Sequence, residues 1–346
     1  YAAPEYRLGL RHILPSRVRY GKTSYMRGTL YSIAILGDFM FSNNDIWKQV
    51  QEYLPVENRI SDDNMPSEKR VSFHDIEIRY DEYLPKEASN VSIIIFHGVG
   101  GNGRLLSFIA VPLVKAGFNV ICPDLPGYGY TKIEKSFDYS TWIDVGSFMV
   151  NREIQAGRDT YVFGLSAGGM LAYNVTCNIK DVKGLIITNI LDNRLQIVRD
   201  YSAKNKFHSR VGIKVLGSLP SIFKKIKVPV KMVANMKAIV NDSHVLRLLL
   251  KDKVGSGSSV SIGFLLSMMN SVPLIEPEDF NICPVLLVHP EVDKWTPTEI
   301  SRLFFDKIQS PKVIKILNSA GHFPIEIPGL QQLERTSIEF ILKHGA

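Results

Sequence analysis

The stretch Thr160-Tyr161-Val162-Phe163-Gly164-Leu165-Ser166-Ala167-Gly168 decides the fold class of this 346-residue chain. Its apolar beginning predicts a short buried strand over 160–163, and a helix is expected from Ala167 to Cys177. Between them, 164–168 matches the pattern G-x-S-x-G, which places a serine on a tight turn from strand to helix. Small neighbours let this strained backbone approach the adjoining strand and helix. The turn therefore presents the Ser166 hydroxyl over the edge of a sheet.

Strands and helices alternate on both sides of this turn from Val71 onward, as in a mostly parallel sheet covered on both faces. Ile76 to Tyr83 alternates like a half-exposed strand, and Val91 to Phe96 is a β-branched run typical of a strand buried on both sides. Further strands are predicted at 118–122, 182–190, 285–288 and 313–317, with helices at 104–116, 141–156, 297–308 and 330–343.

The segment 191–275 interrupts this alternation. It holds 14 basic and four acidic residues, a net charge of +10 in a chain of net charge +7, so the remainder carries −3. Helical spacing recurs at 243–250 and 261–269, and Gly255 to Ser259 is expected to be a flexible joint. We interpret the segment as a helical cap inserted between two strands of the core, which comprises 71–190 and 276–346.

Residues 1–70 form a predicted N-terminal arm whose first 30 residues carry six basic side chains against Glu5. An arm packed on the core, a tail that binds a partner and a membrane-surface element all fit this composition. The chain begins at Tyr1 rather than Met, and a removed signal peptide would leave no trace in it.

Composition is that of a globular protein, with 45% hydrophobic and 22% charged residues. No stretch reaches the roughly 18 consecutive apolar residues of a spanning helix. Cys122, Cys177 and Cys283 are scattered in apolar runs, which predicts free buried thiols and not a disulfide framework or a metal cluster. Free thiols favour a reducing compartment, and we expect a cytoplasmic location.

A serine hydroxyl becomes a good nucleophile only when a base takes its proton. Of eight histidines, His322 has the right context, because its loop (319–324) follows the last predicted strand at the carboxyl edge of the sheet. His97 ends a strand and precedes glycines, so we expect it to shape that loop. His289 also ends a strand but is followed by Pro290.

A carboxylate is expected to orient the imidazole and stabilise its charged form. Glu291 and Asp293 both follow the strand predicted at 285–288, and Asp192 follows the earlier strand at 182–190. Position along the chain leaves all three as candidates.

The loop His97-Gly98-Val99-Gly100-Gly101-Asn102-Gly103 lets backbone N–H groups face inward, as an oxyanion hole requires. Binding of a phosphate is the alternative interpretation of such a loop. However, no Lys-Ser/Thr follows, and leucine occupies the position of the third glycine of G-x-G-x-x-G. We therefore expect no nucleotide here.

The order of these motifs resembles the α/β-hydrolase superfamily over roughly 71–345. Glycine-containing turns follow the third and fourth strands, at His97-Gly98 and at 124–129, and the Ser166 turn follows the fifth. The later Asp293 and His322 complete the order Ser, Asp, His. The resemblance implies an α/β-hydrolase fold: an eight-stranded, mostly parallel sheet with helices on both faces and an inserted helical cap.

The same resemblance assigns roles to particular residues. Ser166 is implied to be the nucleophile, His322 the general base and Asp293, rather than Glu291, the acid. The backbone N–H groups of Val99 and Ala167 are implied to be the oxyanion donors. A nucleophilic aspartate, as in dehalogenase-like relatives, is excluded by the serine at the turn.

Within the superfamily the chain is most similar to monoacylglycerol-lipase and lysophospholipase-type enzymes. We expect a serine-dependent carboxylic-ester hydrolase that forms an acyl-enzyme on acyl or lipid-like esters. An amidase, thioesterase, C–C bond hydrolase or acyltransferase, or a slow-turnover ligand receptor, are the alternatives on the same three residues. We expect no metal, organic cofactor or nucleic acid, and the basic cap favours peripheral contact with an anionic membrane surface.

Overall fold

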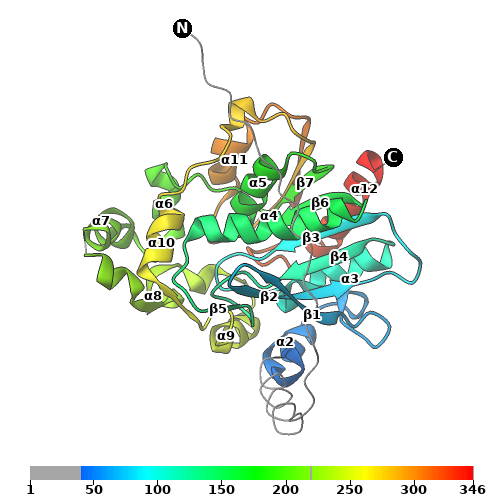
Figure 1. The fold of residues 1–346 in the computed structure, drawn as a ribbon, viewed down its shortest axis with the longest axis horizontal. Helices are drawn as coiled ribbons and strands as arrows, with labels where there is room; N and C mark the ends of the chain where they lie inside the picture. Colours follow the sequence, from blue (N-terminus) through cyan, green and yellow to red (C-terminus); the bar gives the residue numbers. More distant parts are fainter. Residues whose placement is uncertain (1–39, 219, 346) are drawn as a thin grey trace, which may run out of the picture. The chain divides into compact units, whose positions relative to one another are not determined.

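The computed structural model describes residues 40–218 and 220–345, which are built around a central β-sheet (Figure 1). The strands of this sheet are β1 (Ser67–Phe73), β2 (Ile76–Tyr83), β3 (Val91–Phe96), β4 (Asn119–Pro123), β5 (Lys132–Ile133), β6 (Asp159–Gly164), β7 (Gly184–Ile187), β10 (Val285–Pro290) and β11 (Lys312–Leu317). Their order is β1-β2-β4-β3-β6-β7-β10-β11, with the short β5 paired to β2. Pairs from β4 to β11 are parallel, whereas β2 is antiparallel to its neighbours. The predicted eight-stranded, mostly parallel sheet is confirmed, and β5 adds a ninth strand.

Helices cover both faces of the sheet. They are α3 (Ser107–Lys115), α4 (Tyr139–Gln155), α5 (Ala167–Ile179), α11 (Thr298–Phe305) and α12 (Gly329–His344). The Phe96 ring of β3 lies against Gly146 of α4, and the Tyr161 hydroxyl of β6 donates to the Ile341 carbonyl of α12 at 3.2 Å. Phe96 pairs with Gly164, three residues beyond Tyr161. Because side chains alternate along a strand, α4 and α12 cover opposite faces.

Strand β2 differs from its predicted half-exposed state. Arg79 and Asp81 are both buried and form an ion pair. Arg104, which follows the glycine-rich loop in η3 (Arg104–Leu106), donates to Asp81 at 2.7 Å and to Glu68 of β1 at 3.1 Å. Burying an unpaired charge is costly, but these charges neutralise one another across three elements. The alternation in the sequence therefore indicated a strand without revealing that its polar side is covered.

Part of the predicted arm 1–70 lies outside the described residues, namely 1–39. Its remainder forms η1 (Phe41–Asn43), α2 (Asp45–Gln51) and η2 (Val56–Asn58), and then enters the sheet as β1. The Trp47 ring of α2 lies 4.7 Å from the Arg104 guanidinium carbon. Residues from Met40 onward thus pack on the core in part through the buried charges.

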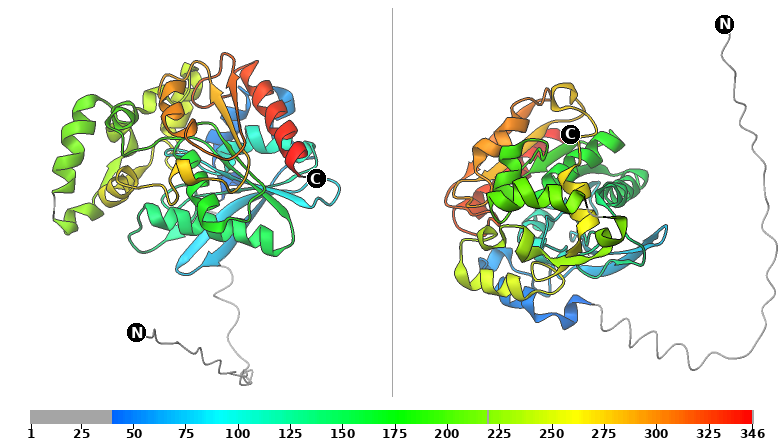
Figure 2. Two further views of the ribbon diagram at one scale, coloured as in Figure 1. Left: turned by 90° about the horizontal axis from the view of Figure 1, so that it is seen from above. Right: turned by 90° about the vertical axis from the view of Figure 1, so that its left-hand side faces the viewer.

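Residues 191–218 and 220–275 lie between β7 and β10 and gather beside the main sheet (Figures 1 and 2). They form α6 (Gln196–Ser202), η4 (His208–Gly212), α7 (Ile213–Gly217), η5 (Ser221–Lys225), β8 (Lys227–Pro229), α8 (Val230–Val233), η6 (Met236–Ala238), α9 (Ser243–Lys251), β9 (Ser259–Ser261) and α10 (Ile262–Met269). Besides these helices, β8 and β9 make a small antiparallel sheet that periodicity had not indicated. The division into core and cap stays a prediction.

The three cysteines are free and buried, as predicted. Burial raises the pKa of the Cys177 and Cys283 thiols to about 12 each, so both stay protonated at neutral pH. Neither residue lines the pockets at Ser166. The thiols therefore belong to the core.

Candidate active site

Ser166 stands on a strained turn between β6 and α5. Its backbone has φ +78° and ψ −116°, a region that residues with a side chain rarely adopt. Two residues later, a Cβ on Gly168 would lie 2.4 Å from the carbonyl oxygen of Phe96 in β3. Only glycine allows so close an approach. The local sequence therefore fixes the turn that presents the hydroxyl at the carboxyl end of β6.

His322 meets this serine from the loop after β11. Its Nε2 lies 2.7 Å from Ser166 Oγ, although the two residues are 156 positions apart in the chain. Two hydrogen bonds from backbone amides hold the loop: the Gly321 amide donates to the Glu326 carboxylate at 3.0 Å, and the Phe323 amide donates to the Ile239 carbonyl at 2.9 Å. The second contact comes from the segment 191–275.

The three candidate carboxylates differ in their burial and in their hydrogen-bond partners. Asp293 is buried, and its Oδ2 lies 2.8 Å from His322 Nδ1. Glu291 is exposed and accepts from the Ser319 amide at 2.8 Å. Asp192 is paired with Arg194 at 2.8 Å. Among these three carboxylates, only Asp293 contacts the imidazole.

Donors surround the Asp293 carboxylate. The amides of Trp295 and Thr296 donate to Oδ1 at 2.7 and 2.9 Å, and the Thr296 hydroxyl and Asn189 amide donate to Oδ2 at 2.9 and 3.1 Å. Burial alone would raise the pKa of Asp293, but His322 and the hydrogen bonds from the Thr296 and Trp295 backbone amides outweigh it, so the pKa lies well below its ordinary value. The group therefore stays charged beside the imidazole.

Asn189 and Thr296 were not singled out from the sequence. Asn189 is fully buried two residues after β7, and its amide also lies 2.9 Å from the Thr296 hydroxyl and 3.0 Å from His289 Nε2. One signal was available, because Thr188-Asn189 is a polar pair at the end of an otherwise apolar strand. A buried polar side chain at the carboxyl edge of a parallel sheet points to the site.

The glycine-rich loop after β3 lies directly beside the serine turn. A Cβ on Gly98 would lie 2.9 Å from Ser166 Cβ and 3.3 Å from the Ala167 nitrogen. The loop then turns, with the Gly101 amide donating to the Gly98 carbonyl at 3.1 Å and Gly100 at φ +83°. Neither the Val99 nor the Ala167 amide donates a hydrogen bond to another described residue. Both predicted donors thus border Ser166 with free N–H groups.

His97 shapes this loop, as the sequence indicated. Its Nδ1 lies 2.8 Å from the Gly98 carbonyl oxygen, and its Nε2 accepts from the Leu125 amide at 3.0 Å. Burial lowers the pKa of His97 to about 4, so the ring is neutral near pH 7. Both ring nitrogens are occupied, which leaves His97 no part in proton transfer at Ser166.

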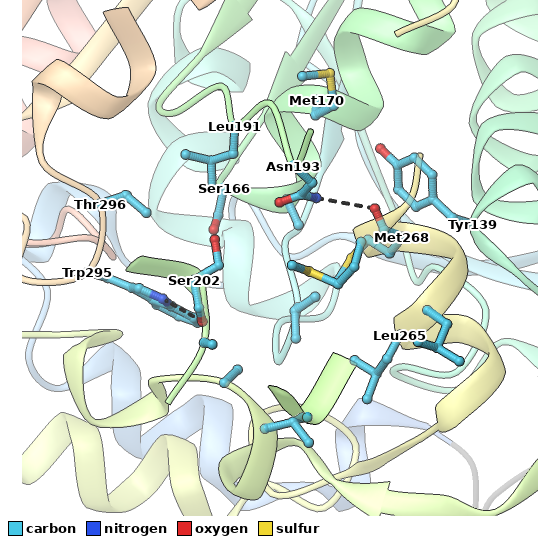
Figure 3. Close-up of a pocket in the computed structure, with 18 of the residues that line it drawn as sticks. Tyr139, Ser166, Met170, Leu191, Asn193, Ser202, Leu265, Met268, Trp295 and Thr296 are labelled. Atoms are coloured by element: carbon cyan, nitrogen blue, oxygen red, sulfur yellow. Dashed lines mark hydrogen bonds between the residues drawn. The ribbon is translucent and has the colours of Figure 1, made fainter. Parts of the chain in front are cut away.

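Two pockets meet at Ser166. The large pocket (Figure 3) has an apolar wall contributed by α5, α10 and the segments around α7 and α8, namely Met170, Leu216, Val233, Leu265, Leu266, Met268 and Met269. The small pocket lies on the His322 side and is lined by Leu105, Leu106, Ile239, Leu249 and Phe323, among others. Ser166 and Val99 border both pockets. A substrate with two apolar parts can therefore place its reacting atom at the serine.

Among residues 40–218 and 220–345, no three His, Cys, Asp or Glu side chains come together as metal ligands would. In the same part of the chain no helix has the length and apolar character needed to cross a membrane.

The sheet order, the serine turn after β6 and the histidine after the last strand define an α/β hydrolase. A family model described as serine aminopeptidase, S33, matches residues 87–325. The chain belongs to this family of hydrolases. A comparison with curated protein sequences finds no match.

Solved structures support the fold. A monoglyceride lipase from Saccharomyces cerevisiae is 15% identical, with a TM-score of 0.68 over 84% of this chain and 98% of that one. A monoacylglycerol lipase from Paleococcus ferrophilus is 18% identical, with a TM-score of 0.61 over 78% and 99%. Epoxide hydrolase A from Mycobacterium thermoresistibile is 15% identical, with a TM-score of 0.55 over 80% and 98%. One fold thus carries different reactions among these proteins.

Proposed function

We propose that the protein is a serine-dependent carboxylic-ester hydrolase that acts on apolar acyl esters through an acyl-enzyme. The observation that carries this proposal is the unbroken hydrogen-bonded path from Ser166 through His322 to Asp293, at 2.7 and 2.8 Å, opening into the large apolar pocket. Nucleophile, base and orienting acid in this geometry are the parts that acyl transfer requires.

The geometry supports a definite sequence of proton transfers. His322 Nε2 takes the proton of Ser166 Oγ as that oxygen bonds to the acyl carbon, while Asp293 stabilises the resulting imidazolium. The carbonyl oxygen gains negative charge, which the free N–H groups of Val99 and Ala167 stabilise. The C–O bond to the alcohol then breaks, and His322 returns the proton to the leaving oxygen. Water repeats the sequence and releases the acid.

The family takes its name from an aminopeptidase, which cleaves the amino-terminal residue from a peptide. The residues that line the two pockets favour an ester as the substrate over such a peptide. An aminopeptidase binds the charged α-amino group of its substrate, and a buried ammonium needs an acidic partner. None of the described residues that line the large or small pocket is Asp or Glu. The apolar walls instead match an uncharged acyl chain, and the flexible Met170, Met268 and Met269 can adapt to chains of different length.

Steady-state kinetics test this choice. With p-nitrophenyl butyrate and octanoate we expect multiple turnovers, and kcat/KM at least about tenfold higher for octanoate because each buried CH₂ contributes ~0.8 kcal/mol. Leucine p-nitroanilide should react on the order of a hundredfold more slowly. Release of a single equivalent of nitrophenol would instead indicate a slow-turnover receptor. Preference for the anilide would support an aminopeptidase.

We further propose that 191–275 acts as the cap over this pocket and carries a membrane-facing patch. The patch comprises Ser221 to Lys227, in which every residue is exposed. Ile222, Phe223 and Ile226 are 73%, 43% and 48% exposed, and they alternate with Lys224, Lys225 and Lys227. Apolar side chains interleaved with lysines fit the boundary of an anionic bilayer, where apolar groups insert and cations meet headgroups.

Binding to vesicles should depend on this patch and on salt. Lys224→Glu/Lys225→Glu is expected to weaken co-sedimentation with phosphatidylserine-containing vesicles by at least about tenfold at low salt, since each nearby charge contributes ~1 kcal/mol. Salt near 0.15 M should weaken wild-type binding too, because the Debye length falls to about 8 Å. Turnover of p-nitrophenyl butyrate should stay unchanged.

A matched control changes the net charge equally elsewhere. Lys86 and Lys183 are exposed and precede β3 and β7, at the amino-terminal edge of the sheet. Lys86→Glu/Lys183→Glu should bind vesicles like the wild type. If both double variants lose vesicle binding equally, the net charge of the protein and not the patch determines binding. If the wild type does not bind vesicles at low salt, the membrane proposal is contradicted.

A further inference from the structure

Residues 252–258 link α9 to β9 and lie against the glycine-rich loop after β3. The sequence predicted a flexible joint at 255–259, but Asp252, Gly255, Ser256 and Ser258 are buried. Backbone bonds fold the segment onto itself: the Gly255 and Gly257 amides donate to the Asp252 carbonyl at 3.1 and 2.8 Å. The glycines serve close packing here, since a Cβ on Gly255 would lie 2.5 Å from the Asp252 carboxylate.

Two side-chain hydrogen bonds join this segment to the loop. The Ser256 hydroxyl donates to the Gly100 carbonyl at 2.8 Å. The Asn102 side-chain amide donates to Asp252 Oδ2 at 3.0 Å, and Asn102 Oδ1 accepts from the Leu105 amide at 3.1 Å. The side chains of Ser256, Asp252 and Asn102 are at most 2% exposed. These hydrogen bonds are therefore shielded from solvent, where losing one partner of a buried pair is costly.

These contacts act on the part of the loop that carries the Val99 amide. Gly98 packs against Ser166 on one side of the turn, while Ser256 holds Gly100 on the other side. With φ +83°, Gly100 adopts the left-handed conformation required at the third position of a type II turn, so the direction of the neighbouring peptide units depends on it. The segment thus holds the turn to which Val99 belongs.

We infer that Asp252 and Ser256 are positioning residues for the oxyanion hole. Through these two residues, the segment 191–275 takes part in acyl transfer. The inference rests on the proposed function. The segment continues directly into β9 and α10, whose Leu265, Met268 and Met269 line the large pocket. Part of the wall of the large pocket and the contact that orients the oxyanion donor therefore belong to one continuous stretch, 252–269.

Removing the Ser256 hydroxyl tests the first contact. Loss of an entire oxyanion donor lowers kcat about 10²–10³-fold, so a donor that is only misaligned should cost roughly tenfold. For Ser256→Ala we expect that fall in kcat on p-nitrophenyl butyrate, with KM within about twofold. The Ki of an alkyl trifluoromethyl ketone, which forms a tetrahedral adduct with an active-site serine, should rise by the same factor as kcat/KM falls.

Ser258→Ala is the matched control, because Ser258 is also buried and its hydroxyl has no hydrogen-bond partner among the described residues. It should leave kcat and Ki unchanged. If Ser256→Ala behaves like Ser258→Ala, Ser256 does not position the loop. If both variants lower thermal stability equally but only Ser256→Ala changes Ki, the positioning role stands.

Exchanging the second pair gives a test by rescue. Asp252→Asn removes one acceptor, and Asn102→Asp places two carboxylates together, so each single variant should lower kcat. In the double variant, Asn at 252 can donate to Asp at 102, while the Val254 and Leu105 amides keep acceptors at these positions. We expect recovery of kcat to within about threefold of the wild type. The role of Asp252 would be overturned if both single variants kept the wild-type kcat, or if the kcat of the double variant were no higher than that of the slower single variant.

Failure of the proposed function can be told apart from failure of this inference. Labelling of Ser166 by a fluorophosphonate requires the nucleophile and the oxyanion donors but no ester turnover. If the wild type hydrolyses no ester yet labels faster than Ser256→Ala, the positioning role survives and the ester proposal does not. If the wild type hydrolyses esters but labelling is equally fast in the wild type and in Ser256→Ala, the ester proposal survives and the positioning role of Ser256 does not.

Discussion

Ser166→Ala is expected to abolish covalent labelling by a fluorophosphonate and to lower kcat for p-nitrophenyl butyrate by about 10⁴-fold or more. The alanine keeps a Cβ on the same backbone, so the turn at φ +78° should persist. What disappears is the oxygen that lies 2.7 Å from His322 Nε2. Mass spectrometry of the labelled protein locates the adduct, and initial rates measure the loss.

Ser202→Ala provides the control for this prediction. Ser202 lines the same large pocket, but its hydroxyl donates to the Val198 carbonyl at 2.9 Å, so no base activates it. The variant should label at Ser166 like the wild type. Labelling that persists in Ser166→Ala would mean that another residue is the nucleophile, and the proposed function would be wrong.

The candidate nucleophile and base were proposed from local sequence rules. A strand, G-x-S-x-G and a helix are contiguous between 160 and 177, and their conformation at Ser166 depends mainly on close packing of the neighbouring glycines. His322 lies just after a strand, so the shared edge of a parallel sheet predicted its neighbourhood. In the structure its Nε2 lies 2.7 Å from Ser166 Oγ, and its role as the base stays a prediction.

The supporting contacts depend on pairs of residues that no local pattern links. Asp252 reaches Asn102 across 150 positions, and Asn189 reaches Asp293 across 104. Gly255 to Ser259 looked like a flexible joint because glycine and serine are common in loops and also where backbone segments pack closely. Likewise, the charges of β2 looked solvent-exposed because their partner Arg104 follows a different strand.

Asp293→Asn is expected to lower kcat by about 10⁴-fold while the protein stays folded. The carboxylate now accepts four hydrogen bonds from Trp295, Thr296 and Asn189 and one from His322. An asparagine at 293 can keep several of the structural donors, but its NH₂ group lacks the charge that stabilises the imidazolium. It also favours the tautomer of His322 in which Nδ1 accepts, and that tautomer leaves a proton on Nε2. His322 could then no longer take the proton of Ser166.

Glu291→Gln is the matched comparison, since Glu291 lies two residues earlier in the same loop and is exposed. It should change kcat less than about threefold, because surface substitutions have small effects. The two variants are measured with p-nitrophenyl butyrate, and fluorophosphonate labelling should be slow in Asp293→Asn alone. A large loss in Glu291→Gln with a mild Asp293→Asn would assign the acid to Glu291. Two mild results would direct attention to Asp192, although its carboxylate is now paired with Arg194 at 2.8 Å and would have to exchange that partner for the imidazole.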